Sequence, residues 1–186
     1  AADMRQDDAS SHKRRALLTN GQDPHAIILG CSDSRVPAEI VFDQGVGDLF
    51  VIRVAGNVVA PSQIDSVEFA AARFGTKLVV VLGHSNCGAI QATLEELARP
   101  SAEQSRKLRS IVDRVRPSVE SLLATDLRHD PVALARHAVR ANIRISVNQL
   151  RRGSEVLEKL IANEGLRIVD AEYSLETGLI EFFDAV

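Results

Sequence analysis

The sequence predicts an α/β fold: a mostly parallel central sheet of about four parallel strands plus an antiparallel edge strand, flanked by helices. Three short runs, AIILG (26–30), LFVIRV (49–54) and KLVVVLG (77–83), are rich in apolar residues without polar alternation. Such runs are typical of parallel strands buried on both faces. Helical segments separate them, which implies right-handed βαβ crossovers. Two apolar segments around ETG (176–178) predict a C-terminal hairpin that adds the antiparallel edge strand.

Six segments carry the signals of helices. In the segment 62–75, apolar residues recur at helical spacing, with Ser62 as the expected cap and Gly75 as the stop. The longest helix follows Asp130, the expected N-cap, and Pro131 at its first position. The predicted helices span 36–45, 62–75, 88–98, 101–124 with a break or kink at Pro117, 131–152 and 154–165.

Length and composition indicate one ordinary globular domain spanning residues 1–186. The apolar fraction is 45%, the charged fraction is 25% and the formal net charge is -3. This charge gives no reason to expect nucleic acid or an anionic membrane as a partner. No apolar run reaches the roughly 18 to 20 residues that cross a bilayer, and no signal peptide is visible. We therefore expect a cytoplasmic protein, with a removed targeting segment as the alternative.

Three residues of metal-binding types follow two of the predicted strands. Cys31 comes directly after strand 26–30, and His84 and Cys87 come directly after strand 77–83. Because the carboxyl ends of parallel strands meet at one edge of a sheet, these side chains are expected to converge. Thiolate and imidazole favour zinc, and three protein ligands leave one position open, as in catalytic sites. The sequence thus predicts one Zn²⁺ per subunit, with a Cys31–Cys87 disulfide or redox pair as the alternative.

Asp33 and Arg35 form a second candidate group beside the metal ligands. In an extended segment, residues 31, 33 and 35 project to the same side. Asp33 could then accept a hydrogen bond from a zinc-bound hydroxide, while Arg35 keeps the carboxylate ionised and oriented. The alternative is that Asp33 only caps the helix that follows Val36.

The charge of the ligand set predicts the pH dependence. Two thiolates and a neutral imidazole cancel the charge of Zn²⁺, so the ion should acidify its water less than a site with three histidines does. We expect an activity that rises through the alkaline side of neutrality.

At these residues the chain resembles the β-class carbonic anhydrases. The motifs that carry the resemblance are CSDSR (31–35) and HSNC (84–87), supported by the segments 42–57 and 66–70, and the likeness runs from about Gln22 to the last strand. The resemblance implies a zinc-dependent lyase that hydrates carbon dioxide reversibly to bicarbonate through a zinc-bound hydroxide. It also implies a Cys-His-Cys zinc site, an Asp–Arg dyad and a homodimer or a dimer of dimers (homotetramer), with active sites at the subunit interface.

The resemblance also assigns roles to four substrate-binding residues. Gln22 matches a glutamine that reaches across the dimer to bicarbonate, and the backbone N–H of Gly88 matches a donor to bound substrate. Phe50 and Phe69 match apolar walls of the carbon dioxide pocket. Without the resemblance, Gln22 would be a solvated loop amide and both phenylalanines would be core residues.

The sequence departs from the family pattern in two places. Residues 1–21 correspond to the N-terminal arm, but the usual aromatic-bearing motif of that arm is absent. The chain has no tryptophan, so the inhibitory bicarbonate site that some members build around one is not expected. A carbon disulfide hydrolase and a catalytically inactive zinc or redox assembly module are the remaining alternatives. The intact set of Gln22, Asp33 and Arg35 argues against the inactive module.

Overall fold

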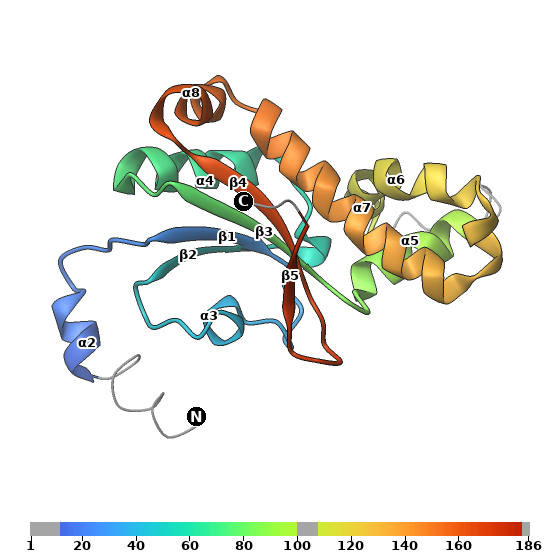
Figure 1. The fold of residues 1–186 in the computed structure, drawn as a ribbon, viewed down its shortest axis with the longest axis horizontal. Helices are drawn as coiled ribbons and strands as arrows, with labels where there is room; N and C mark the ends of the chain where they lie inside the picture. Colours follow the sequence, from blue (N-terminus) through green and yellow to red (C-terminus); the bar gives the residue numbers. More distant parts are fainter. Residues whose placement is uncertain (1–11, 100–107, 184–186) are drawn as a thin grey trace.

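A computed structural model describes residues 12–99 and 108–183 and contains one five-stranded sheet in the order β2-β1-β3-β4-β5 (Figure 1). The first four strands in this order are parallel, and β5 is antiparallel to β4. This confirms the predicted sheet, including the antiparallel edge strand. The strands are β1 (Ala26–Gly30), β2 (Leu49–Arg53), β3 (Leu78–His84), β4 (Arg167–Tyr173) and β5 (Ile180–Phe182).

The helices are unevenly distributed around the sheet. Figure 1 shows α4, α7 and α8 along one face and α3 beneath the other, while α5 and α6 form a lobe with α7 beyond the end of β3. The helices are α2 (His12–Leu17), α3 (Ala38–Val41), α4 (Pro61–Phe74), α5 (Gly88–Ala98), α6 (Arg109–Leu123), α7 (Pro131–Arg152) and α8 (Glu155–Glu164). Two 3₁₀ turns, η1 (Ala55–Asn57) and η3 (Asp126–His129), complete the described elements.

The central strands are buried on both faces, as their apolar runs predicted. All five residues of β1 are buried, and so are six of the seven in β3. The glycine in β3 has a packing reason: a Cβ on Gly83 would lie 2.4 Å from the side chain of Ile143. Gly83 therefore lets α7 approach the sheet directly beside the end of β3, where the candidate metal ligands begin.

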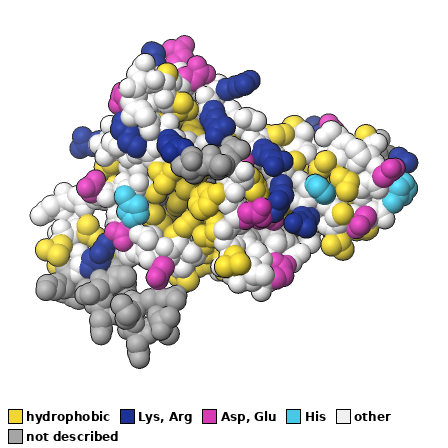
Figure 2. Space-filling model, viewed as in Figure 1, with side chains coloured by type: hydrophobic (Ala, Val, Ile, Leu, Met, Phe, Trp, Pro, Cys, Tyr) yellow, Lys and Arg dark blue, Asp and Glu magenta, His cyan; other side chains and the backbone are white. Residues whose placement is uncertain are grey.

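The two faces of the sheet have different cover. On one face, Ile27, Leu29 and Val81 pack into the larger core together with residues of α4, α7 and α8. On the other face, Ile28 and Val80 belong to a smaller cluster to which only α3 contributes helix residues. Figure 2 shows hydrophobic side chains gathered over the middle of this second face.

Three local predictions are wrong in whole or in part, and each has a physical reason. The segment 36–45 forms only the single turn α3, because Asp43 has a φ of 55° and leaves the helical region. Ser62 is not the cap of α4, since the helix begins at Pro61 and has no side-chain cap. Helix α6 continues through Pro117, so of the predicted break or kink the break does not occur; this residue is exposed, and water can solvate the carbonyl that loses its helical donor.

The other helix ends match the expectation from their cap residues. Asp130 Oδ1 accepts hydrogen bonds from the backbone N–H groups of Val132 and Ala133 at the start of α7. Gly75 ends α4 in the left-handed conformation, with a φ of 69°. Part of the predicted helix 101–124 and most of the N-terminal arm lie outside the described residues. Within the described ranges, no helix combines the length and apolarity that crossing a bilayer requires.

Candidate metal centre

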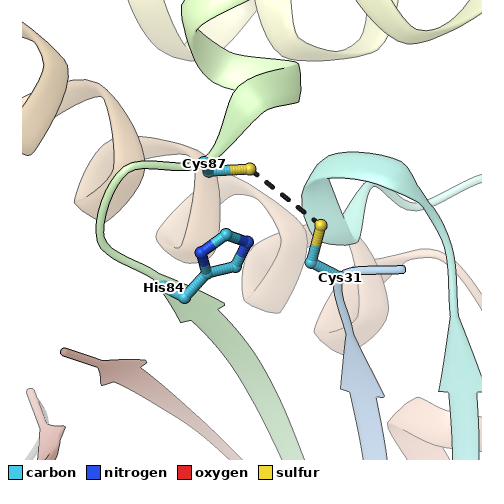
Figure 3. Close-up of side chains that lie close together, drawn as sticks. All are labelled: Cys31, His84 and Cys87. Atoms are coloured by element: carbon cyan, nitrogen blue, oxygen red, sulfur yellow. Dashed lines mark hydrogen bonds between the residues drawn. The ribbon is translucent and has the colours of Figure 1, made fainter. Parts of the chain in front are cut away.

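Cys31, His84 and Cys87 converge at the carboxyl end of the sheet (Figure 3). Cys31 follows β1, His84 ends β3, and Cys87 caps the N-terminus of α5. One potential ligand atom from each lies within 4.8 Å of the other two. All three are buried, with exposures of 5%, 0% and 2%. The sequence prediction that two neighbouring parallel strands bring these residues together agrees with this arrangement.

The spacing of the sulfur atoms fits one tetrahedral ion better than a disulfide. The Sγ atoms of Cys31 and Cys87 are 4.0 Å apart, and both cysteines are free. Two thiolates bound to zinc at about 2.3 Å in a tetrahedron lie about 3.8 Å from each other. A disulfide would need about 2.05 Å. The residues present therefore fit zinc with little adjustment of the two cysteines.

His84 presents one nitrogen to the two sulfur atoms. Its Nδ1 lies 2.8 Å from the carbonyl oxygen of Ser85, which can only accept, so Nδ1 carries the proton. Its Nε2 is buried and has no hydrogen-bond partner. Burying a polar atom without a hydrogen-bond partner costs free energy, so such an atom often marks the place of a bound group. A metal ion on Nε2, with Nδ1–H held by a carbonyl, is the arrangement usual for histidine ligands.

The cluster favours a thiolate at Cys31. A hydrogen bond from the Cys87 thiol, opposed by burial, lowers the pKa of Cys31 well below its ordinary value. The same hydrogen bond, together with burial, raises the pKa of Cys87. Burial alone would lower the pKa of His84, but its interactions with Cys31 raise the value overall. The cluster thus places one thiolate, that of Cys31, where a divalent cation would sit.

Asp33 lies beside this cluster and is held by Arg35. The Nε and Nη2 atoms of Arg35 donate to Oδ1 and Oδ2 of Asp33 at 2.9 and 2.8 Å. This bidentate contact lowers the pKa of Asp33 well below its ordinary value. The Oδ2 atom is 3.8 Å from Nε2 of His84. The alternative role of Asp33 as a helix cap is wrong, because α3 has Pro37 at its cap position and no side-chain cap.

Of the four residues with implied substrate roles, Gly88 lies beside the metal cluster, and the other three lie away from it in the same chain. Gly88 is the first residue of α5, next to Cys87, where backbone N–H groups have no partner inside the helix. Gln22 precedes β1, so the five residues of β1, about 16 Å of strand, separate it from Cys31. Phe50 pairs in register with Ile27, about 13 Å of strand before Cys31.

Phe50 and Phe69 form an aromatic cluster with Phe74. The ring centroids of Phe50 and Phe69 are 6.2 Å apart, and those of Phe69 and Phe74 are 5.6 Å apart. Phe69 is 54% exposed, which is unusual for a phenylalanine on a core helix. Within one chain, neither this cluster nor Gln22 lines the metal cluster.

Several residues of the site were not singled out from the sequence. Arg53, at the end of β2, donates to the carbonyl oxygens of Cys31 and Asp33 at 3.1 and 2.6 Å. Glu176, in the turn between β4 and β5, accepts hydrogen bonds from Ser85 Oγ and Asn86 Nδ2, both at 2.7 Å. The positions of these residues on neighbouring strand ends were the only available signal, since none belongs to a ligand motif.

Comparison with known proteins agrees with this geometry. The family model described as carbonic anhydrase matches residues 26–180. A carbonic anhydrase of Mycolicibacterium smegmatis is 40% identical over 91% of this chain and 79% of its own length. Carbonic anhydrase 2 of Mycobacterium tuberculosis is 39% identical with the same coverage.

Solved structures show the same fold. A β-carbonic anhydrase of Aspergillus fumigatus superposes with a TM-score of 0.77 at 26% identity, covering 94% of this chain and 82% of its own. One of two tetrameric β-carbonic anhydrases of Sordaria macrospora gives a TM-score of 0.81 at 24% identity, covering 92% and 86%. Together with the family match over most of the chain, these similarities establish that the protein belongs to the carbonic anhydrase family, in its β class.

Proposed function

We propose that the chain is a zinc-dependent carbonate dehydratase that interconverts carbon dioxide and bicarbonate. The observation that carries the proposal is the buried set of two sulfur atoms and one unpartnered imidazole nitrogen, with an Arg35-bound carboxylate beside it. Cys31, His84 and Cys87 would hold the ion. A zinc ion held there would supply the acidification of water that provides a nucleophile for carbon dioxide.

Asp33 and Arg35 orient the nucleophile. Arg35 fixes both carboxylate oxygens and keeps Asp33 ionised, and Oδ2 of Asp33 faces the ligand cluster. An ionised carboxylate can only accept a hydrogen bond, so Asp33 turns the proton of the attacking oxygen toward itself and a lone pair toward the substrate. The carboxylate is partly open to solvent, with 16% of its side chain exposed, which allows water and product to exchange there.

The backbone N–H of Gly88 and the side chain of Gln22 bind bicarbonate, and Phe50 and Phe69 line the path of carbon dioxide. Gly88 can act within its own chain because it follows Cys87 directly. Gln22 and Phe50 are separated from Cys31 of their own chain by about 16 and 13 Å of strand, and Phe69 packs against Phe50. We propose that they act on the site of a second copy in a homodimer, and that two such dimers can form a tetramer.

The thinly covered face of the sheet supports the dimer. Among the helices that the structure describes, only α3 contributes residues to the apolar cluster on this face, and Ile40 on α3 is 65% exposed. Leu17 on α2 and Val46 after α3 are 77% and 42% exposed. Large apolar side chains that gather on one side of a protein are typical of an interface between subunits.

Location of the protein in the cytoplasm stays a prediction.

The first experiment measures metal content and reaction together. We expect about one zinc per chain by elemental analysis, and rapid acidification of a weakly buffered solution on stopped-flow mixing with carbon dioxide. The same preparation is assayed on carbon disulfide, which distinguishes the related hydrolase. Stoichiometric zinc without any acceleration of carbon dioxide hydration would contradict the proposed function.

A second experiment tests whether Gln22 acts across the dimer. The variants Gln22→Ala and His84→Ala are each expected to be weakly active alone. In a mixed dimer, the subunit with an intact metal site receives an intact Gln22 from its partner. Coexpression of the two variants should then restore roughly a quarter of the wild-type sites, because half of the dimers are mixed and each regains one site of two. No recovery in isolated mixed dimers would mean that Gln22 does not act in trans.

A further inference from the structure

The 3₁₀ turn η1 contacts both halves of the metal centre. The backbone N–H of Gly56 lies 3.3 Å from the sulfur of Cys31 and donates a hydrogen bond to it. A Cβ on Gly56 would lie 3.1 Å from Cβ of Ala89, so the turn also packs against the first turn of α5, beside Cys87. The position of this turn therefore decides where the Gly56 N–H points relative to Cys31.

The conformation of the turn is unfavourable by itself. Gly56 has a φ of 68° and Asn57 has a φ of 44°, so two successive residues lie in the left-handed region. Glycine adopts this region freely, but asparagine does so at a cost. A turn of this kind persists when surrounding contacts hold it in place.

Two buried polar residues of α7 supply those contacts. Asn142 Nδ2 donates to the carbonyl oxygen of Gly56 at 2.7 Å, and Ser146 Oγ donates to the carbonyl oxygen of Asn57 at 2.9 Å. The two residues are 2% and 1% exposed and lie four positions apart, hence on one face of the helix. They sit among the apolar core residues of α7, where a polar side chain is costly unless it is hydrogen bonded.

We propose that Asn142 and Ser146 are positioning residues for the zinc ligand Cys31. By fixing the carbonyl groups of η1, they hold the Gly56 N–H on the Cys31 sulfur. A hydrogen bond to a thiolate stabilises its charge and orients its lone pairs, and such outer contacts contribute to metal affinity. The inference rests on the proposed zinc site, but it does not depend on the reaction that the site performs.

The test compares zinc affinity in three single variants of the full chain. Ser146→Ala and Asn142→Ala each remove one hydrogen bond to η1. Ser118→Ala is the matched control, because Ser118 is also buried and helical but donates to Val115 within its own helix. Zinc affinity is measured by competition with a chromophoric chelator, and the cobalt-substituted proteins are compared by their thiolate-to-cobalt charge-transfer bands.

We expect Ser146→Ala and Asn142→Ala to weaken zinc binding about 10-fold each and to shift the charge-transfer band. Ser118→Ala should stay within about twofold of wild type with an unchanged band. Because both residues act on one turn, the double variant should lose less than the product of the single losses. Should Asn142→Ala fail to fold, Ser146→Ala alone, which removes one oxygen atom, decides the question.

Two outcomes separate this inference from the proposed function. Equal zinc affinities and cobalt spectra in Ser146→Ala and Ser118→Ala would overturn the positioning role while leaving the carbonate dehydratase activity intact. Conversely, a wild-type protein that binds zinc but does not hydrate carbon dioxide would contradict the function. In that case, a loss of zinc affinity in Ser146→Ala and Asn142→Ala, but not in Ser118→Ala, would still support the positioning role.

Discussion

Cys31 is supported from the buried side of the site, whereas the loop between His84 and Cys87 is supported from the exposed side. Behind Cys31, Asn142 and Ser146 hold the turn η1, and all of these hydrogen bonds are buried. On the other side, Glu176 binds Ser85 and Asn86, and Asn86 accepts a hydrogen bond from Arg35 at 3.3 Å. Glu176 itself is exposed.

The difference in burial predicts a difference in energetic weight. Removing one partner of a buried hydrogen bond leaves the other unsatisfied, which costs about 1–3 kcal/mol. An exposed charged group can be replaced by water, so the contacts of Glu176 should contribute little. We infer that the buried side retains the metal ion. The exposed side keeps Asp33 and Arg35 in contact with solvent, where substrate and protons must enter and leave.

The largest effect is expected from the loss of a metal ligand. Cys87→Ser replaces a thiolate by a hydroxyl that binds zinc poorly. Binding free energies of roughly 10–16 kcal/mol for structural zinc sites with four ligands correspond to about 2.5–4 kcal/mol per ligand, or about 10²- to 10³-fold in affinity. The variant should therefore lose its zinc during purification, together with its activity. Elemental analysis and thermal unfolding check this, and a folded variant with full zinc content would contradict the role of Cys87.

The next largest effect is expected from Asp33→Asn. The variant keeps the shape of the side chain but removes its charge. It also places an amide, which can donate, where the proposed mechanism needs a carboxylate that only accepts hydrogen bonds. We expect kcat/KM to fall about 10²-fold, as for removal of one positioned group in other enzymes. Zinc affinity should change little, since Asp33 does not belong to the ligand set. Wild-type activity in a zinc-loaded variant would remove Asp33 from the mechanism.

The pH profile tests whether the titration of Asp33 limits the reaction near neutral pH. Arg35 lowers the pKa of Asp33, so Asp33 stays ionised throughout the neutral range. Its ion pair stabilises the fold above the unfolded-state pKa of about 4, and this stability is lost only as the pH falls through the lower folded value. We expect kcat/KM to rise through the alkaline side of neutrality. A stopped-flow profile that is already flat by about pH 6 would contradict the charge argument.

The smallest effect is expected from Glu176→Gln. Its amide group accepts at one atom only, so one of the contacts to Ser85 and Asn86 is lost to water. We expect kcat/KM to fall by about twofold, with unchanged zinc affinity. A loss of zinc affinity as large as that of Ser146→Ala would break the distinction between the buried and exposed sides. Both variants are measured with the same chelator.

The local structure was predictable where one residue type dominates the outcome. Asp130 caps α7 because its carboxylate reaches two free N–H groups, and buried β-branched runs form the parallel strands. The predicted length of the helix at 36–45 was wrong, because the backbone leaves the helical region at Asp43. The predicted cap Ser62 was wrong, because α4 already begins at Pro61. For α6, an exposed proline was tolerated because water replaces the missing partner.

The sequence by itself determined the strands and their parallel direction. It also determined that Cys31, His84 and Cys87 lie at one edge of the sheet, because the carboxyl ends of parallel strands meet there. Only the tertiary structure decided which groups hold those residues in place. Asn142 and Gly56 are 86 positions apart, and Glu176 is 90 positions from Asn86. Contacts at such separations leave no periodic signal in the chain, since they depend on how helix and sheet pack.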